Sequence, residues 1–208
     1  MQAFDIRHSV LVRITHWINA AAFVGLVVSG IAILLAHPRL YWGETGGIGT
    51  PSLLDLPLPF MLTGQSGWGR SLHFLSAWVC VLNGLLYLVY GMRTRHFKED
   101  LIPARKNLST QSYNMLQRLA YSTVVFVLFP LMIWTGFAMS PAITSVFPWI
   151  VTLLSGQQSA RTIHFVVTNL LVIFLGVHLA MVFLSGFTTN MRAMLTGRAR
   201  KELHADPS

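Results

Sequence analysis

The chain of 208 residues is poor in cysteine and in charge. Its single cysteine, Cys80, excludes an intramolecular disulfide framework, a Cys-X-X-Cys-His attachment for covalent haem and an iron–sulfur cluster held by cysteines. Charged residues make up 11% of the chain, against about 25% in an average soluble domain, and 53% of the residues are hydrophobic. This composition argues against a soluble protein, and we expect Cys80 to be a small core residue inside a membrane span.

Four windows of the sequence contain no Asp, Glu, Lys or Arg, and each reaches the roughly 20 residues that a helix needs to cross a hydrocarbon core. The windows are Ile14–Ala36, Leu72–Met92, Leu119–Met139 and Thr162–Met191. We predict an all-α membrane protein, a four-helix transmembrane bundle that forms one domain over 1–208. The predicted spans are about 10–36, 70–92, 114–139 and 160–188, with outer loops 37–69 and 140–159, an inner loop 93–113 and a tail 189–208.

Positive charge gathers on one side of these spans. The N-terminus, the second loop and the tail together hold 12 of the 15 Lys and Arg residues. The positive-inside rule therefore places both termini and the second loop on the cytoplasmic side of the membrane. The net charge of +8 is explained by this distribution and by contact with membrane lipid, so we do not expect a nucleic-acid partner.

Four histidines lie inside the predicted spans, which is unusual for an ionisable side chain. His164 and His178 are fourteen positions apart. In an α-helix this separation corresponds to a rise of about 21 Å and to a rotation that falls roughly 40° short of four full turns. The two histidines therefore lie on nearly the same helix face at two depths. Consecutive spans run in opposite directions. His73 is therefore expected near His164 on the outer side, and His16 near His178 on the inner side.

An imidazole in hydrocarbon needs partners for its ring nitrogens. A hydrogen bond to a carbonyl or a serine would explain any one of these histidines alone. Four of them matched in depth are explained better as axial ligands of two haems, His16 and His178 for an inner haem and His73 and His164 for an outer haem. Iron with two histidine ligands has no open position for a gas, so such haems transfer electrons. Without a Cys-X-X-Cys-His motif they are expected to be non-covalent b haems.

Three of the four histidines follow an arginine by three positions, in the motifs RITH, RSLH and RTIH. Side chains at i and i+3 share a helix face, so Arg13, Arg70 and Arg161 lie one turn nearer the membrane surface than the histidines. A guanidinium suits a carboxylate, and we expect these arginines to bind haem propionates. The alternative is that they extend to the lipid headgroups without contacting haem.

The residues that carry these motifs also resemble a known family. RITHW, RSLHF and RTIHFVVTNLLVIFLGVH are similar to segments of the bacterial di-haem cytochrome b family, which includes cytochrome b-561 and the cytochrome b subunits of nickel–iron hydrogenases and formate dehydrogenases. The resemblance covers roughly Ile6 to Ala193. It implies a four-helix bundle with two b haems, held by histidines paired as above.

A further resemblance lies at the start of the third predicted span, in YNMLQRLAY. It is similar to a Tyr-Asn-X-Gly-Gln-Lys segment that lines a quinone pocket in formate dehydrogenase cytochrome subunits. The resemblance implies quinone contacts for Tyr113, Asn114, Gln117 and Arg118, although Leu116 replaces the glycine of the motif and Arg118 its lysine. The alternative for Asn114 and Gln117 is helix capping at the membrane edge.

Two classes of function remain after these observations. The first is an electron-transfer subunit that joins menaquinone or ubiquinone to a periplasmic redox enzyme of the molybdopterin or hydrogenase type, which would dock on the outer loops. A stand-alone relative would instead oxidise a small external donor such as superoxide. The second class is a transporter that uses its histidines for metal or protons, but no intramembrane carboxylate accompanies them. The sequence leaves a homodimer open.

Overall fold

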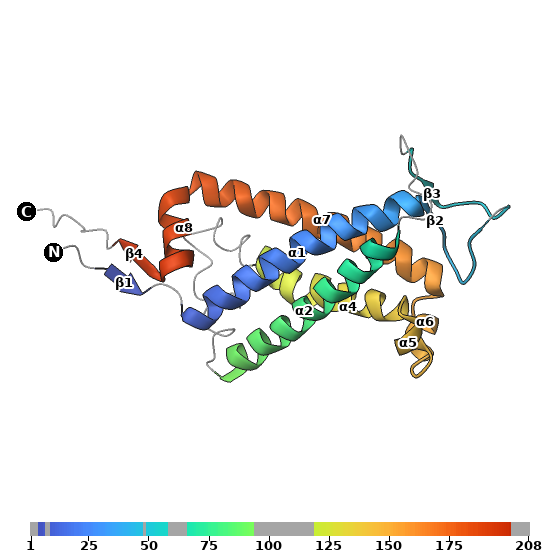
Figure 1. Cartoon of the computed structure of the whole chain (residues 1–208), viewed down its shortest axis with the longest axis horizontal. Coiled ribbons are helices and arrows are strands. Elements are labelled where there is room, and N and C mark those ends of the chain that lie inside the picture. The colour runs from blue at the N-terminus through green and yellow to red at the C-terminus, as the bar shows by residue number, and fades with distance from the viewer. Residues whose placement is uncertain (1–3, 7–8, 48, 58–65, 94–118, 201–208) are drawn as a thin grey trace, which may run out of the picture.

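A computed structural model describes residues 4–6, 9–47, 49–57, 66–93 and 119–200, and in this part of the chain four long helices run side by side (Figure 1). The helices that are long and apolar enough to cross a membrane are Val10–Ala36, Gly67–Arg93, Leu119–Ala138 and Gln157–Leu184. The predicted four-helix transmembrane bundle is therefore confirmed. The strands β1, Phe4–Ile6, and β4, Arg198–Arg200, lie at one end of the bundle, called the inner end below. The strands β2, Arg39–Leu40, and β3, Leu54–Asp55, lie at the other end, called the outer end.

The described helices lie over the predicted spans with somewhat different ends, and residues 114–118 of the third predicted span and 94–113 of the predicted inner loop lie outside the described part of the chain. Helix α1 covers Val10–Ala36, α2 covers Ser66–Arg93 and α7 covers Gln157–Leu184. The fourth span thus ends four residues before the predicted 188, because Gly186 has a φ of 101° and turns the chain. Helix α8, Phe187–Thr196, follows this turn at a steep angle to α7, so the predicted tail contains a helix (Figure 1).

Helices α1 and α2 approach closely because glycines face small side chains at their contact. A Cβ built on Gly25 would lie 2.5 Å from Ser76 Oγ, and a Cβ built on Gly69 would lie 3.2 Å from Ala32 Cβ. Small residues at such positions let membrane helices pack through van der Waals contact, since lipid tails provide no hydrophobic drive for association. The Asn83 side-chain amide adds a buried hydrogen bond of 2.7 Å to the Thr15 carbonyl.

The third span contains a wide helical turn ahead of a proline. The π-helix η3, Val124–Leu128, precedes α4, Phe129–Ala138, and the Phe129 N–H donates to the Val124 carbonyl five residues back. Pro130 has no N–H to give to the helix. A π turn inserts one extra residue, which rotates everything after it relative to a regular helix.

The first outer loop is fastened to the start of α7. The backbone N–H groups of Gln158 and Ser159 donate to the Gly43 carbonyl at 3.0 and 3.3 Å, and Gly43 N–H donates to Ser159 Oγ at 2.7 Å. The loop thereby supplies an acceptor for N–H groups that a helix start leaves without an intrahelical partner. Thr162 Oγ1 also donates to the Tyr41 carbonyl at 2.6 Å.

Two short sheets and two short helices complete the described chain. Strand β2, Arg39–Leu40, pairs antiparallel with β3, Leu54–Asp55, and Arg39 binds Asp55 at 3.0 Å. Helices α5, Pro141–Thr144, and α6, Trp149–Thr152, lie in the second outer segment. Strand β1, Phe4–Ile6, pairs antiparallel with β4, Arg198–Arg200, at the inner end.

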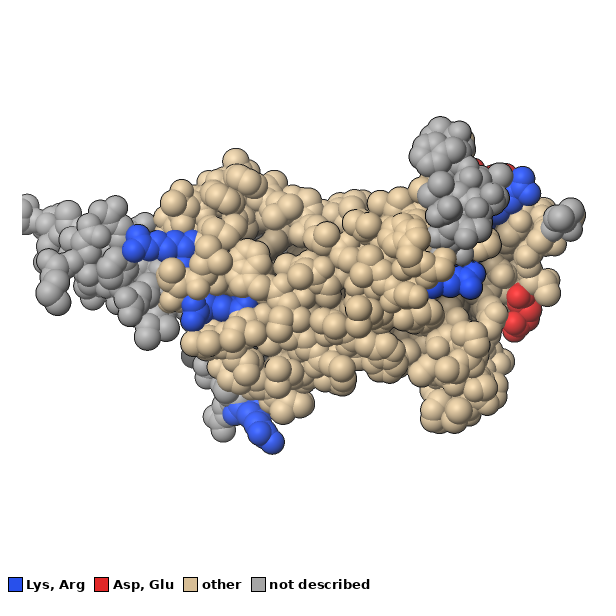
Figure 2. All heavy atoms as spheres, in the orientation of Figure 1, with Lys and Arg blue, Asp and Glu red and all other residues tan. Residues whose placement is uncertain are grey.

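Charged side chains gather at the two ends of the visible face, and a broad middle zone has none (Figure 2). Many large apolar side chains are exposed along the helices, for example Leu82 at 61% and Ile173 at 62%. In water such surface would be unfavourable, whereas in a bilayer it contacts lipid tails. The charge-free zone is therefore the part of the surface that hydrocarbon covers.

We expect Gly156→Ala to destabilise the protein, because Gly156 has a φ of 115° and an added Cβ would overlap the Gly43 carbonyl. A strained residue of this kind costs about 1–3 kcal/mol, which lowers the unfolding temperature of a chain of this size by roughly 2–12 °C. Thermal unfolding in detergent, followed by circular dichroism, measures the shift. Gly47→Ala is the matched control, since nothing lies within 4 Å of its added Cβ, and equal unfolding temperatures for both variants would contradict the fastened loop.

Candidate functional site

The outer half of the bundle contains one pair of facing histidines. His73 comes from α2 and His164 from α7, and their ring centroids are 6.2 Å apart with an angle of 59° between the planes. The two helices are not neighbours in sequence. Both helices begin at the outer end of the bundle, α2 at Ser66 and α7 at Gln157, and each histidine follows the start of its helix by about two turns, so the two rings lie at one depth.

The inner half contains a second pair with similar geometry. His16 of α1 and His178 of α7 have ring centroids 6.4 Å apart and planes inclined by 49°. The structure thus brings the four histidines together in the two combinations that depth predicts. Helix α7 supplies one ring to each pair.

The separation of the rings suits one metal ion between each pair. A metal–imidazole bond is about 2.0 Å and the ring centre lies about 1.1 Å beyond the nitrogen, so two rings on one ion have centroids about 6.2 Å apart. Among the described residues, no group of three or more His, Cys, Asp or Glu side chains could hold a metal ion. A pair of imidazoles at this distance therefore fits a metal whose other ligands come from a cofactor, as in haem.

A buried hydroxyl contacts the Nδ1 atom of each outer histidine. Ser29 Oγ of α1 lies 3.0 Å from His73 Nδ1, and Thr135 Oγ1 of α4 lies 2.9 Å from His164 Nδ1. Both hydroxyls are completely buried. Sequence reasoning missed both residues, because serine and threonine are common on membrane helices and only the fold shows which of them face a histidine.

The inner histidine of α7 has an aromatic environment. His178 stacks on Phe174 at 6.2 Å, and the Tyr121 ring meets it edge-on at 6.4 Å. Tyr121 OH lies 3.5 Å from His178 Nδ1, at the limit of a hydrogen bond. A cavity of about 50 Å³ between the third span and α7 is lined by Ala120, Tyr121, Phe174, Val177, His178 and Met181.

Two glycines lie against the edges of the outer imidazoles. A Cβ built on Gly30 would be 3.7 Å from His73 Cε1, and one on Gly136 would be 3.8 Å from His164 Cε1. The absence of a side chain at these positions leaves room beside each ring. A flat macrocycle that approaches the helix backbone needs such room.

The three predicted propionate arginines have different surroundings. Arg13 donates to the Leu195 carbonyl at 2.7 Å, and its Nε is buried without a hydrogen bond to any described residue. Arg161 donates to the His37 carbonyl, and the Arg70 side chain is exposed. The buried Nε of Arg13 suits a further acceptor such as a carboxylate, whereas the Leu195 contact also ties α1 to α8.

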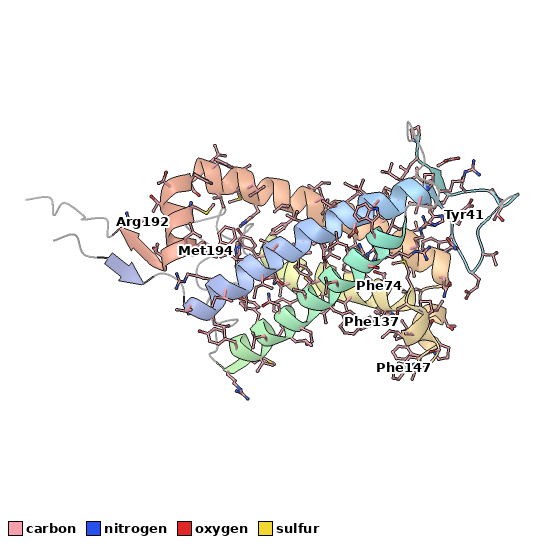
Figure 3. The ribbon with its side chains drawn as sticks, in the orientation of Figure 1. Tyr41, Phe74, Phe137, Phe147, Arg192 and Met194 are labelled. Atoms are coloured by element: carbon pink, nitrogen blue, oxygen red, sulfur yellow. The ribbon has the colours of Figure 1, made fainter. Side chains whose placement is uncertain are left out.

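A larger cavity opens at the outer end beside Arg161. It has a volume of about 670 Å³ and is lined by the first outer loop and the start of α7, with His37, Arg39, Tyr41, Asp55 and Arg161 among its walls. Tyr41 lies at this end of the bundle, while Met194 and Arg192 of α8 lie at the opposite end (Figure 3). Burial, and then the charges of Arg161 and Arg70, lower the pKa of His37 below its usual 6.5. The positive charge on this wall of the cavity therefore comes from Arg161, and His37 is harder to protonate than a free histidine.

The predicted quinone residues lie outside the described part of the chain. The described part of the third span begins at Leu119, and the four predicted residues come before it: Tyr113, Asn114, Gln117 and Arg118. Their expected contacts stay predictions. Ala120 and Tyr121, two and three residues after Arg118, line the small cavity at His178.

Histidine pairs at two depths of a four-helix membrane bundle are typical of membrane-bound haem proteins, and the comparisons with known proteins agree with this class. Residues 7–197 match the family described as prokaryotic cytochrome b561. The chain is also similar to the putative protein-methionine-sulfoxide reductase subunit YedZ1 of Azospira oryzae, with 31% identity over 196 residues that cover 84% of this chain and 89% of that protein. No solved structure matches the chain significantly.

The chain belongs to the prokaryotic cytochrome b561 family. It is a multi-pass protein of the bacterial inner membrane and a b-type haem protein of electron transport. The resemblance drawn from RITHW, RSLHF and RTIHFVVTNLLVIFLGVH is thereby confirmed at the level of the family.

Proposed function

We propose that the chain holds two b haems, one between His73 and His164 and one between His16 and His178, and carries electrons across the membrane between them. The observation that carries this proposal is the pair of ring separations, 6.2 and 6.4 Å, at two depths of one bundle. When bound, haem b supplies one-electron chemistry. Two histidines would hold each haem and leave no iron position open, so the residues favour electron transfer over oxygen binding.

The surrounding residues support a flat, carboxylate-bearing cofactor. Gly30 and Gly136 leave space at the outer rings. Arg161 stands at the outer surface one turn from His164, and Arg13 has a buried Nε one turn from His16. We assign these two arginines and Arg70 to the haem propionates, because a guanidinium binds a carboxylate with two parallel hydrogen bonds.

We place the redox partner at the outer end of the bundle. The similar protein from Azospira oryzae is described as a putative reductase subunit, which supports an oxidoreductase partner for this chain. The two outer segments, His37–Arg70 and Pro141–Ala160, expose large apolar side chains in their described parts, including Trp42, Leu53, Val146 and Trp149. The partner would be a periplasmic enzyme of the molybdopterin or hydrogenase type.

We place the quinone at the inner end of the bundle. The residues proposed to contact it stand at the start of the third predicted span: Tyr113, Asn114, Gln117 and Arg118. Tyr121 comes three residues after Arg118 in the sequence and lies beside His178. Menaquinone or ubiquinone reacting there would exchange protons with the cytoplasm while electrons cross to or from the outer partner. Each charge moved across the membrane costs or yields about 2.3 kcal/mol per 100 mV, so the side of the site has an energetic consequence.

The haem assignment predicts a stoichiometry of two b haems in the purified protein and one in each ligand variant. His73→Leu should lose the outer haem and keep the inner one, and His16→Leu should do the reverse. His37→Leu is the control, because His37 lies outside both pairs. A pyridine haemochrome assay against protein mass measures the ratio. A parental protein with no haem would falsify the proposal, and a parental protein with one haem per chain would mean that only one of the two histidine pairs binds haem.

The double variant Asn114→Leu, Gln117→Leu should keep both haems reducible by dithionite but exchange electrons with added quinone at least about tenfold more slowly. Loss of two hydrogen-bonding groups at a buried site costs about 1–3 kcal/mol each, which supports a change of this size. Stopped-flow oxidation of the reduced haems by a quinone measures it, and Asn169→Leu, an exposed amide on α7, is the control. Parental rates in the double variant would move the site away from this segment.

Crosslinking tests the side on which the partner docks. A photoreactive side chain placed at Trp42 or Trp149, both more than half exposed, should capture a periplasmic oxidoreductase in membranes of the native host. Mass spectrometry of the captured band identifies the partner. The same probe at Arg93, at the inner end of α2, is the control, and capture of the oxidoreductase there alone would reverse the assignment.

A further inference from the structure

The third span contributes no histidine, yet it reaches both histidines of α7. Thr135 Oγ1 lies 2.9 Å from His164 Nδ1, and Tyr121 OH lies 3.5 Å from His178 Nδ1. Tyr121 and Thr135 are fourteen positions apart, as are the two histidines. The π turn at Val124–Leu128 lies between them and adjusts the direction in which Thr135 points.

The hydrogen bonds around Thr135 determine which atom carries the proton. Thr135 Oγ1 lies 2.9 Å from the Leu131 carbonyl and 3.0 Å from the Met132 carbonyl, and a carbonyl only accepts. The single hydroxyl hydrogen is therefore directed to the backbone. The contact of 2.9 Å between Thr135 Oγ1 and His164 Nδ1 then needs its hydrogen from the imidazole. In this arrangement His164 Nδ1 carries the proton, and Nε2 keeps its lone pair.

Ser29 makes the same arrangement on the opposite side of the outer pair. Its Oγ donates to the Gly25 carbonyl at 2.6 Å and approaches the Leu26 carbonyl at 3.2 Å. The contact of 3.0 Å with His73 Nδ1 then receives its hydrogen from the ring. Both outer rings thus direct an unprotonated Nε2 away from a buried hydroxyl on a neighbouring helix.

We propose that Ser29 and Thr135 are positioning residues of the outer haem site, which fix the Nε2-ligating tautomer of His73 and His164 and lower the midpoint potential of the haem they hold. The inference rests on the proposed ligation of haem by these histidines. A ligand imidazole that donates from its second nitrogen is more basic. A more basic ligand stabilises ferric iron over ferrous iron, so removal of the hydroxyl raises the potential.

The inner ring of α7 has a weaker contact of the same kind. Tyr121 OH is 0.6 Å farther from His178 than Thr135 Oγ1 is from His164, as the distances of 3.5 and 2.9 Å show. The strong hydroxyl contacts of α7 and α2 thus belong to the outer pair, and the effect of Ser29 and Thr135 is expected to be confined to the outer haem.

Thr135→Val and Ser29→Ala remove the hydroxyls at nearly constant shape. Potentiometric titration of the purified protein, followed by haem absorbance, measures each haem, and the outer component is the one missing from His73→Leu. Each variant should raise the ratio of reduced to oxidised outer haem at a fixed potential about threefold to tenfold, which is about 28 to 59 mV for a one-electron couple. The inner component should not move, and the low-spin electron paramagnetic resonance signal of the outer haem should shift.

Matched controls separate this effect from a general loss of hydroxyl groups. Thr123→Val changes an exposed threonine on the same span, and Ser71→Ala changes an exposed serine two residues before His73. Thr135→Ser keeps the hydroxyl and should restore the parental potential and spectrum. Unchanged outer-haem potential and spectrum in both Thr135→Val and Ser29→Ala would overturn the proposal.

Haem content, measured on the same samples, separates failure of this inference from failure of the haem assignment. If the parental protein contains no haem, the haem assignment itself is wrong. If the parental protein contains two haems and the outer-haem potential does not change in the variants, only the proposed role of the hydroxyls is wrong. If Thr135→Val loses the outer haem alone, restoration by Thr135→Ser supports the proposal and persistent loss in Thr135→Ser contradicts it. If Thr135→Val does not fold, the titration of Ser29→Ala decides.

Discussion

An imidazole buried in hydrocarbon has two nitrogens, and each needs a partner. In the outer half of this bundle, Nδ1 of each histidine contacts a buried hydroxyl, and the centroids of the two imidazoles lie 6.2 Å apart. Much of the structure serves this arrangement. The close packing of α1 on α2 at Gly25 brings Ser29 to His73, and the π turn in the third span precedes the residue that reaches His164.

The same constraint explains why the fourth helix is so regular. Helix α7 runs from Gln157 to Leu184 without a proline, and it must present His164 and His178 on one face at two depths. Its start is held by the first outer loop through the Gly43 carbonyl, so a segment at the outer end of the bundle is attached to the helix that supplies both pairs. A partner bound to this loop would contact the rigid end of the helix that the proposed electron path follows.

Much of the fold and part of the site could be predicted from the sequence. The charge-free windows were sufficient for four spans, because a bilayer requires about 20 apolar residues in a row whatever the tertiary packing. The pairing of His16 with His178 and of His73 with His164 followed from depth alone. Ser29, Thr135 and Gly136 could not be found in this way, since their roles depend on how the helices are rotated about their axes. The turn at Gly186 was missed because the window without charged residues continues past it to Met191.

The central claim is that each histidine pair holds one iron. An experimental map of the purified protein with anomalous scattering at the iron edge tests it most directly. The account predicts two iron peaks, one midway between His73 and His164 and one midway between His16 and His178, each about 2.0 Å from two ring nitrogens. A single peak, or an iron bound by any other pair of side chains, would contradict it.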